Sequence, residues 1–183
     1  LPRFLSLADA TDTPARQSEM RFRAALAAER HQRPALALEQ AERIPLAPVA
    51  AFCRMQLLSG RRQFQALWDA FAEEDIAAWT TAVEPEVFAG LPPIDPDAVS
   101  SAESALGNAF RMRGVAARVL NRNDAALRDL RQAADRIPPG YWGAVALSEL
   151  GSLLRKQGDP EAALLAYRRI LDDDRYRWHP HAA

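Results

Sequence analysis

The chain contains little of several residue types on which common functions depend. Cys53 is the single cysteine among 183 residues, which excludes an intrachain disulfide and any metal site built from several cysteines. The formal net charge of −1 at pH 7 disfavours a general nucleic-acid binder, which is normally basic. No run in the sequence approaches the roughly 18 to 20 apolar residues that a membrane-spanning helix needs. These shortages exclude a transmembrane helix within this chain and disfavour nucleic acid as a partner.

Groups that could carry catalysis are also sparse. Cys53 lies beside Phe52 on the apolar side of an expected helix, and no histidine near it in sequence could activate the thiol. His179 and His181 stand close to three aspartates at 172–174, but side chains two apart on a helix face different directions. No glycine-rich phosphate loop is present. The sequence therefore predicts a protein that is not an enzyme and that uses no metal or cofactor.

The composition is that of a folded protein. Hydrophobic residues make up 49% of the chain and charged residues 26%, and the length fits one domain or one short solenoid. Lys156 is the single lysine among 23 basic residues, which indicates a GC-rich, bacterial source. Because Leu1 is not a start methionine, we expect the chain to be a fragment of a longer protein. The expected compartment is the bacterial cytoplasm, or the periplasm if a leader or anchor preceded Leu1.

Residues 144–177 predict two helices joined by a Gly-Asp-Pro turn. Their apolar residues recur at helical spacing on both sides of the turn: Leu147, Leu150, Leu154, then Ala163, Tyr167 and Ile170. Gly151 interrupts the first helix, where glycine costs about 1 kcal/mol relative to alanine, so we expect it to pack closely on a small face at Ala162 and Ala163. This spacing resembles the tetratricopeptide repeat, with Leu147 in place of its tryptophan and Arg175 near the position of its closing proline.

A second copy of the pattern lies 37 residues earlier. The offset is constant at four positions, which pair Gly114 with Gly151, Asn121 with Gly158, Ala126 with Ala163, and Leu130 with Tyr167. The resemblance is specific for residues 107–177 and weaker for 15–75. It implies an all-α fold, a right-handed α-solenoid of about four antiparallel helical hairpins.

Turn residues divide the chain into expected segments of a single domain, 1–183. The hairpins are expected at 15–45, 46–75, 101–138 and 141–173, with Ser59-Gly60 as the break inside the second. Between them, 76–100 holds four prolines and four acidic residues and no basic residue, so we expect an irregular Pro-rich connection after a short helix near 75–83. Such a connection is either functional or a spacer.

The resemblance also implies that the first helix of each hairpin lines a concave groove. If Phe110, Gly114 and Ala117 face the packing partner, a polar stripe is left on the first helices of the last two hairpins. The candidate partner-binding residues are Asn108, Arg111, Arg118, Ser148, Ser152 and Arg155. Residues 101–140 hold seven arginines and four acidic residues, whereas 76–100 is acidic. Three interpretations follow: the groove binds an acidic segment of another protein, the acidic connection occupies it, or both charged surfaces are simply solvated.

The family's carboxylate-clamp subtype is not matched, because Met112, Val115 and Val145 stand where polar groups are needed. We interpret the chain as a non-catalytic scaffold that binds a peptide or helix of a partner protein, in assembly of a bacterial complex. The alternative is an accessory or regulatory helical-repeat domain of a larger enzyme or transcription regulator. A third hypothesis is self-association, because an uncapped end of a solenoid exposes apolar surface.

Overall fold

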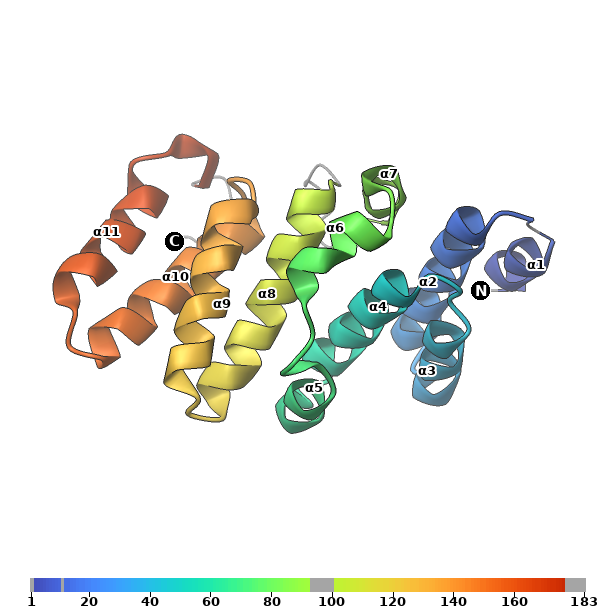
Figure 1. Cartoon of the computed structure of the whole chain (residues 1–183), viewed down its shortest axis with the longest axis horizontal. Coiled ribbons are helices and arrows are strands. Elements are labelled where there is room, and N and C mark those ends of the chain that lie inside the picture. Colours follow the sequence, from blue (N-terminus) through green and yellow to red (C-terminus); the bar gives the residue numbers. More distant parts are fainter. Residues whose placement is uncertain (1, 11, 93–100, 177–183) are drawn as a thin grey trace. The chain divides into compact units, whose positions relative to one another are not determined.

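A computed structural model describes residues 2–10, 12–92 and 101–176, and every regular element in them is helical (Figure 1). The all-α prediction is confirmed for these residues. None of the helices in these ranges has the length and apolar character needed to cross a membrane. In chain order the elements are α1 (Pro2–Asp9), α2 (Pro14–Arg30), α3 (Pro34–Glu42), α4 (Ala47–Gly60), α5 (Phe64–Phe71), η1 (Ile76–Ala78), α6 (Trp79–Ala82), α7 (Pro85–Ala89), α8 (Ala102–Val119), α9 (Asn123–Arg136), α10 (Tyr141–Lys156), α11 (Pro160–Leu171) and η2 (Asp174–Tyr176).

Proline marks the start of many of these helices. Besides α1, whose first residue is Pro2, five helices carry proline at one of their first two positions, where its missing N–H is not needed for an intrahelical bond: Pro14, Pro34, Pro48, Pro85 and Pro160. At α11 the carboxylate of Asp159 also accepts a hydrogen bond from the backbone N–H of Ala162 at 3.0 Å. The local sequence therefore sets these helix starts before any tertiary packing is considered.

Four interhelical turns share one backbone conformation. In each, a residue with positive φ ends the preceding helix: Gln32 (56°), Arg62 (56°), Asn121 (58°) and Gly158 (86°). The residue that follows donates its N–H to a carbonyl five positions back, in the pairs Arg33–Ala28, Gln63–Leu58, Arg122–Ala117 and Asp159–Leu154. This is the Schellman motif. The expected break at Ser59-Gly60 lies slightly too early, because α4 continues through Gly60 and the turn that follows consists of Arg61 and the positive-φ residue Arg62.

The chain forms two compact units. Of the described residues, unit 1 comprises 2–10, 12–63, 75–92 and 101–102, and unit 2 comprises 64–74 and 103–176. In unit 1, α2 packs on α1, α3, α4 and α7. Its core contains a chain of aromatic rings, in which Phe22 stacks on Phe52 at 5.9 Å, Phe52 meets Phe88 edge-on at 6.3 Å, and Phe88 stacks on Trp79 at 6.4 Å.

The segment 76–92 differs from the irregular connection expected from its prolines. The short helix near 75–83 is present as η1 and α6, but Pro85 opens a further helix, α7, that the sequence analysis did not predict. Apolar side chains of this segment are buried: Ile76, Trp79, Val83, Phe88 and Leu91. The segment is therefore part of the core of unit 1 and not a spacer. Residues 93–100, the rest of the expected connection, lie outside the described residues.

In unit 2, α10 packs on α9 and on α11. The two glycines that the 37-residue offset pairs make equivalent contacts. A Cβ atom at Gly114 would lie 3.0 Å from Leu130 Cγ, and one at Gly151 would lie 2.7 Å from Tyr167 Cε1. Each contact joins the glycine to the residue sixteen positions later, so the repeated pattern corresponds to a repeated packing contact. The expected partner of Gly151 needs correction, because the tyrosine ring, and not Ala162 or Ala163, lies over it.

Candidate partner-binding face

The six candidate residues occupy two different environments in unit 2. Asn108 and Arg111 on α8 are buried, with 3% and 7% of their surface exposed, although the sequence pattern placed them on an open wall. Arg118, two turns after Arg111, is partly exposed. Ser148, Ser152 and Arg155 on α10 are exposed. The stripe therefore has a buried polar end on α8 and an accessible row on α10.

The buried end is organised around the Arg111 guanidinium. Its Nε donates a hydrogen bond to Asn108 Oδ1 at 3.1 Å, and Asn108 Nδ2 donates to the Ser104 carbonyl at 3.0 Å. These two bonds determine the orientation of the Asn108 amide. The guanidinium carbon lies 4.0 Å from the ring centre of Trp142 on α10, and Tyr141 meets the same ring edge-on at 4.7 Å. Stacking of this kind stabilises a cation by about 0.5–2 kcal/mol, depending on how far it is desolvated.

The charge of Arg111 is only partly compensated. Burial lowers the pKa of Arg111 to about 10, and the negative charge of Glu149 acts in the opposite direction. The side chain keeps its proton at neutral pH, so a cation is held in a desolvated position. Glu149 forms its ion pair with Arg118 instead, whose Nε lies 2.7 Å from Glu149 Oε2. A cation in this setting is a good receptor for an additional anion.

The Arg118–Glu149 pair is close but poorly aligned. Nε of Arg118 is enclosed and has no hydrogen-bond acceptor within the described residues, despite its 2.7 Å separation from the carboxylate oxygen. The Arg118 and Glu149 side chains are 35% and 27% exposed, so water screens the attraction between them. The pair joins α8 to α10 beside the exposed row, and a competing carboxylate could replace Glu149 there.

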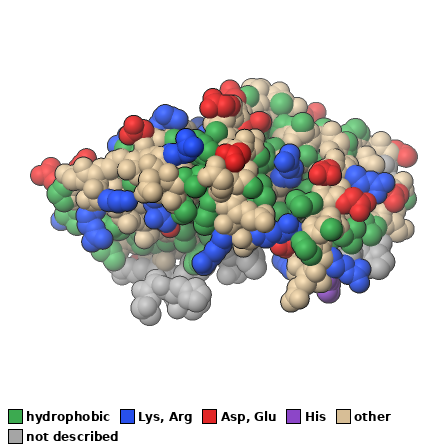
Figure 2. Space-filling view, turned by 90° about the horizontal axis from the view of Figure 1, so that it is seen from below, with side chains coloured by type: hydrophobic (Ala, Val, Ile, Leu, Met, Phe, Trp, Pro, Cys, Tyr) green, Lys and Arg blue, Asp and Glu red, His purple; other side chains and the backbone are tan. Residues whose placement is uncertain are grey.

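One face of the molecule carries charges of both signs. On the face shown in Figure 2, the side chains of arginine and lysine alternate with those of aspartate and glutamate over an otherwise mixed surface. Such a distribution lacks the continuous basic track that follows a nucleic-acid backbone.

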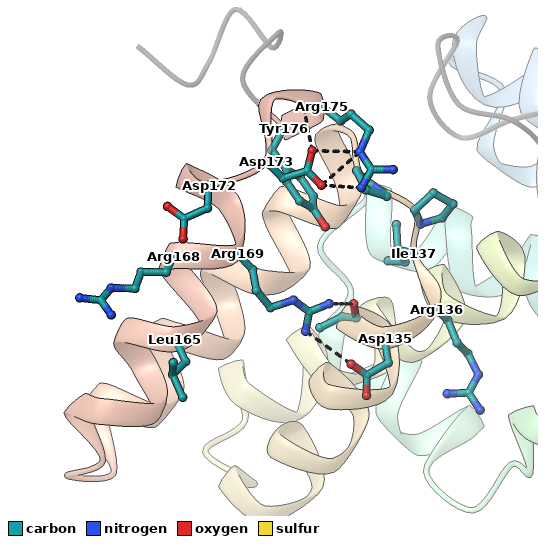
Figure 3. A pocket seen from close by; sticks show the side chains of 13 residues that line it. Asp135, Arg136, Ile137, Leu165, Arg168, Arg169, Asp172, Asp173, Arg175 and Tyr176 are labelled. Atoms are coloured by element: carbon teal, nitrogen blue, oxygen red, sulfur yellow. Dashed lines mark hydrogen bonds and ion pairs between the residues drawn. The ribbon is translucent and has the colours of Figure 1, made fainter.

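A separate open pocket of 730 Å³ lies where α11 and η2 meet the end of α9 (Figure 3). Its wall combines apolar side chains, among them Ile137, Leu165 and Tyr176, with several arginines and aspartates. Figure 3 shows the side chain of Arg168 directed away from the pocket and that of Arg169 directed across it, toward Asp135. The charged groups nearest its centre are thus already engaged with one another.

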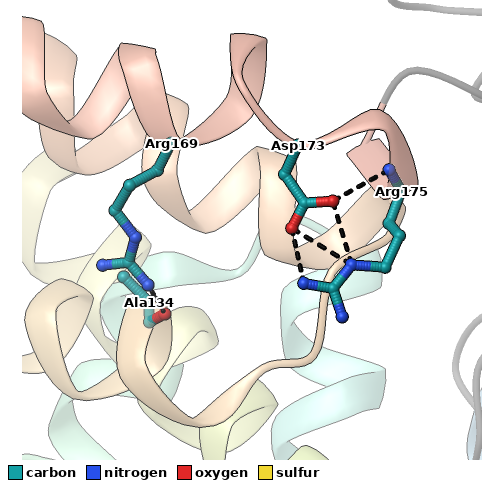
Figure 4. Close-up of polar contacts among 4 residues, drawn as sticks. All are labelled: Ala134, Arg169, Asp173 and Arg175. Atoms are coloured by element: carbon teal, nitrogen blue, oxygen red, sulfur yellow. Dashed lines mark hydrogen bonds and ion pairs between the residues drawn. The ribbon is translucent and has the colours of Figure 1, made fainter.

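The polar contacts of this pocket connect η2 and α11 to their surroundings (Figure 4). Arg169 Nη2 donates to the Ala134 carbonyl at 3.0 Å, and Asp173 accepts three hydrogen bonds from the Arg175 side chain. Tyr176 covers Gly143, where an added Cβ would lie 3.0 Å from the tyrosine ring. These contacts hold the last described turn against α10 and α11. We assign the pocket a structural role.

Two residues of the face were not predicted from the sequence. Trp142 and Glu149 complete the surroundings of Arg111, but their pairing with α8 joins positions about one repeat apart, and no local spacing signals it. Within the described ranges no group of three His, Cys, Asp or Glu side chains is placed to hold a metal ion. His179 and His181 lie outside those ranges. Comparison of the chain with protein-family models, with curated proteins and with solved structures gives no match.

Proposed function

We propose that the chain is a non-catalytic scaffold built from tetratricopeptide-like helical hairpins, arranged as a right-handed solenoid. Support comes from the repeated contacts of unit 2, in which Gly114 and Gly151 receive the side chains of Leu130 and Tyr167. The positive-φ turn residues Asn121 and Gly158 follow the same 37-residue offset. Two successive hairpins with matching packing and turns are the unit from which such solenoids are built.

The proposed role of the scaffold is to bind a segment of a partner protein along α8 and α10. The observation that carries this proposal is the exposed row of hydrogen-bonding side chains Ser148, Ser152 and Arg155, one helical turn apart on α10. The row runs beside Arg118 and Glu149, whose weakly aligned ion pair could exchange partners. Hydroxyl and guanidinium groups in this arrangement suit the carbonyls and carboxylates of an extended chain.

Steric blocking of the α10 row tests this role. Ser148→Tyr and Ser152→Tyr add bulk to exposed positions, so folding should be unaffected while access to the row is lost. Arg128→Tyr, at an exposed position of α9, is the matched control. Quantitative affinity capture from the native host should recover a protein with wild type and with the control but not with the blocked variants. The same difference should appear with the purified partner, and equal recovery by all four proteins would exclude this face.

Self-association is a second candidate because α11 exposes large apolar side chains. Leu164, Leu165 and Leu171 are 49%, 63% and 61% exposed. Exposed leucines close together on one helix commonly mark a contact surface. Sedimentation velocity over a range of protein concentrations tests this candidate, and Leu164→Glu with Leu171→Glu should abolish any dimer. A monomer at all concentrations would exclude it.

A further inference from the structure

We propose that Arg111 and Arg118 together bind two carboxylates of an extended acidic segment, and that these carboxylates are three residues apart in the partner. The inference rests on the proposed function, because it specifies the chemistry of the segment that the α8–α10 face would take.

Arg111 leaves most of its hydrogen-bonding capacity unused. A guanidinium has five N–H donors, and Arg111 uses the one on Nε for Asn108. Neither terminal nitrogen donates to any group among the described residues, and 7% of the Arg111 surface remains exposed. One face of the group is covered by Trp142. What remains is the two-nitrogen edge, whose parallel donors match the two oxygens of a carboxylate.

The Arg111 guanidinium is also held in an energetically unfavourable environment. Arg111 is 7% exposed, and among the described residues the carboxylate that acts most strongly on its charge, Glu149, is paired with Arg118. A desolvated cation without its own counter-ion is unfavourable, so an incoming carboxylate gains more there than at an exposed arginine. Arginine, tryptophan and tyrosine are also enriched among the residues that contribute most to binding at protein interfaces. Arg111 is therefore the anchor of the site.

The spacing of the two arginines determines the spacing in the ligand. Arg111 and Arg118 are seven residues apart on α8, which corresponds to about 10.5 Å along a helix that rises 1.5 Å per residue. A chain in the polyproline II conformation rises about 3.1 Å per residue and has three residues per turn, so acidic side chains three apart lie on the same side, about 9 Å apart. A Glu-x-x-Glu or Asp-x-x-Asp segment in this extended conformation matches the spacing of the two arginines.

The carboxylate of Glu149 competes with the second carboxylate of the ligand for Arg118. In the free protein its carboxylate occupies Arg118 and also attracts Arg111 electrostatically. The second carboxylate of the ligand must displace it from Arg118. Removing the charge of Glu149 should therefore strengthen binding of an acidic ligand, whereas a merely structural ion pair would give no such gain. This gain distinguishes a binding role from a structural one.

The test uses fluorescein-labelled peptides and fluorescence anisotropy with the full chain at low ionic strength, where charge pairing is least screened. The probe is Gly-Ser-Glu-Ser-Pro-Glu-Ser-Gly, and Gly-Ser-Ser-Glu-Glu-Ser-Pro-Gly has the same composition with adjacent glutamates. A third peptide carries glutamine at both acidic positions of the probe. We expect the probe to bind about tenfold more tightly than either comparison peptide, since both of its carboxylates can be held bidentately.

Variants then assign the contacts. Arg111→Met should lose probe binding, Arg111→Lys should weaken it because lysine keeps the charge but lacks the fork, and Glu149→Gln should strengthen it. Arg128→Met removes an exposed arginine of α9 and should leave binding unchanged. Thermal unfolding checks that each variant folds. Equal binding of the probe and the adjacent-glutamate peptide, or full binding by Arg111→Met, would overturn the inference.

Different results would exclude the proposed binding face on α10 and the proposed binding of two carboxylates by Arg111 and Arg118. If Ser152→Tyr blocks a partner whose binding is insensitive to Arg111→Met, the inference is wrong and the proposed face stands. If the blocked variants capture as well as wild type, the proposed function fails before the peptides are considered. Arg111-dependent binding of a labelled oligothymidylate, with no binding of the probe, would overturn the acidic-segment assignment in favour of a nucleic acid.

Discussion

Arg113 on α8 and Asp129 on α9 form a buried pair with two hydrogen bonds, Nε to Oδ2 at 2.6 Å and Nη2 to Oδ1 at 2.9 Å. Nη1 of the same arginine donates to the carbonyls of Phe71 and Glu74, at 3.1 Å and 2.6 Å. One side chain therefore joins the end of α5 to α8 and α9 within unit 2. This contact explains physically why α5 belongs to unit 2, although the sequence grouped 46–75 as one hairpin.

Asp129→Asn should destabilise unit 2 strongly. The substitution keeps the shape of the side chain but leaves the Arg113 cation buried without its counter-ion, a loss of about 3–5 kcal/mol in comparable pairs. Urea unfolding followed by circular dichroism measures the change. The double variant Arg113→Met with Asp129→Leu should recover part of the loss, because it removes both charges. A loss below about 1 kcal/mol for Asp129→Asn would mean that the pair contributes no more than an exposed one.

Gly151→Ala should destabilise the protein although alanine is the better helix former. The added methyl group would lie 2.7–2.8 Å from ring atoms of Tyr167, and overpacking of this kind costs about 1–3 kcal/mol. In a Tyr167→Ala background the same change should become neutral or stabilising, which a double-mutant cycle measures. Gly60→Ala is the matched control, because no atom lies within 4 Å of its added methyl group. It should stabilise by about 0.5–1 kcal/mol.

At the positive-φ turn positions, replacing glycine should lower stability and introducing glycine should raise it. Gly158→Ala should destabilise by about 1–2 kcal/mol, since alanine is strained at a φ of 86°. Arg62→Gly should stabilise by less than this, because the relief of strain is partly offset by the greater freedom of glycine in the unfolded chain. Melting temperatures of the two variants give the comparison. Equal shifts in the same direction would contradict the turn assignment.

Phe88→Ala tests whether 76–92 is part of the core. Phe88 is buried and contacts both Phe52 and Trp79, so its loss should cost about 3–5 kcal/mol. Val87→Ala, on the same short helix but less buried, is the control and should cost much less. Chemical denaturation monitored by tryptophan fluorescence measures both. If 76–92 were only a spacer, both substitutions would lower the free energy of unfolding by small and similar amounts.

The contrast between hairpins and connection shows what the sequence could predict. The helices of 101–177 follow from apolar spacing and turn residues within about ten positions, and the constant offset between Gly114 and Gly151 corresponds to matching contacts. By contrast, the prolines of 76–92 suggested an irregular segment, whereas its apolar side chains are buried through contacts with residues distant in the sequence. Phe88 reaches Phe52 on α4, a contact that no local pattern encodes. Three of the four turns also use Gln, Arg or Asn where glycine is the usual signal.

The candidate site was predictable in its residues but not in its environment. Helical periodicity placed Arg111 and Arg118 on one stripe, and both contact α10. Periodicity cannot tell which part of a stripe a neighbouring element covers, so the burial of Asn108 and Arg111 was missed. The same limit applies to Trp142, because cation–ring stacking depends on how two helices pack and not on the spacing within either one.

Cys53 should make stability fall at alkaline pH. Burial raises the pKa of the thiol to about 12, so the folded protein keeps this proton while the unfolded chain releases it above about pH 8.5. The unfolded state then binds fewer protons than the folded state, and the free energy of unfolding decreases by up to about 1.4 kcal/mol per pH unit between these two values.

Cys53→Ala isolates this effect, because the other groups that titrate at alkaline pH are common to both proteins. Urea unfolding at neutral pH and near pH 10 should show a loss about 2 kcal/mol greater in wild type than in the variant. The thiol should also react with Ellman's reagent only as fast as unit 1 opens, since Cys53 is fully buried. Rapid labelling of the native protein would contradict this prediction, as would free energies of unfolding that depend on pH in the same way in wild type and Cys53→Ala. Both results would mean that the thiol is accessible in the folded protein.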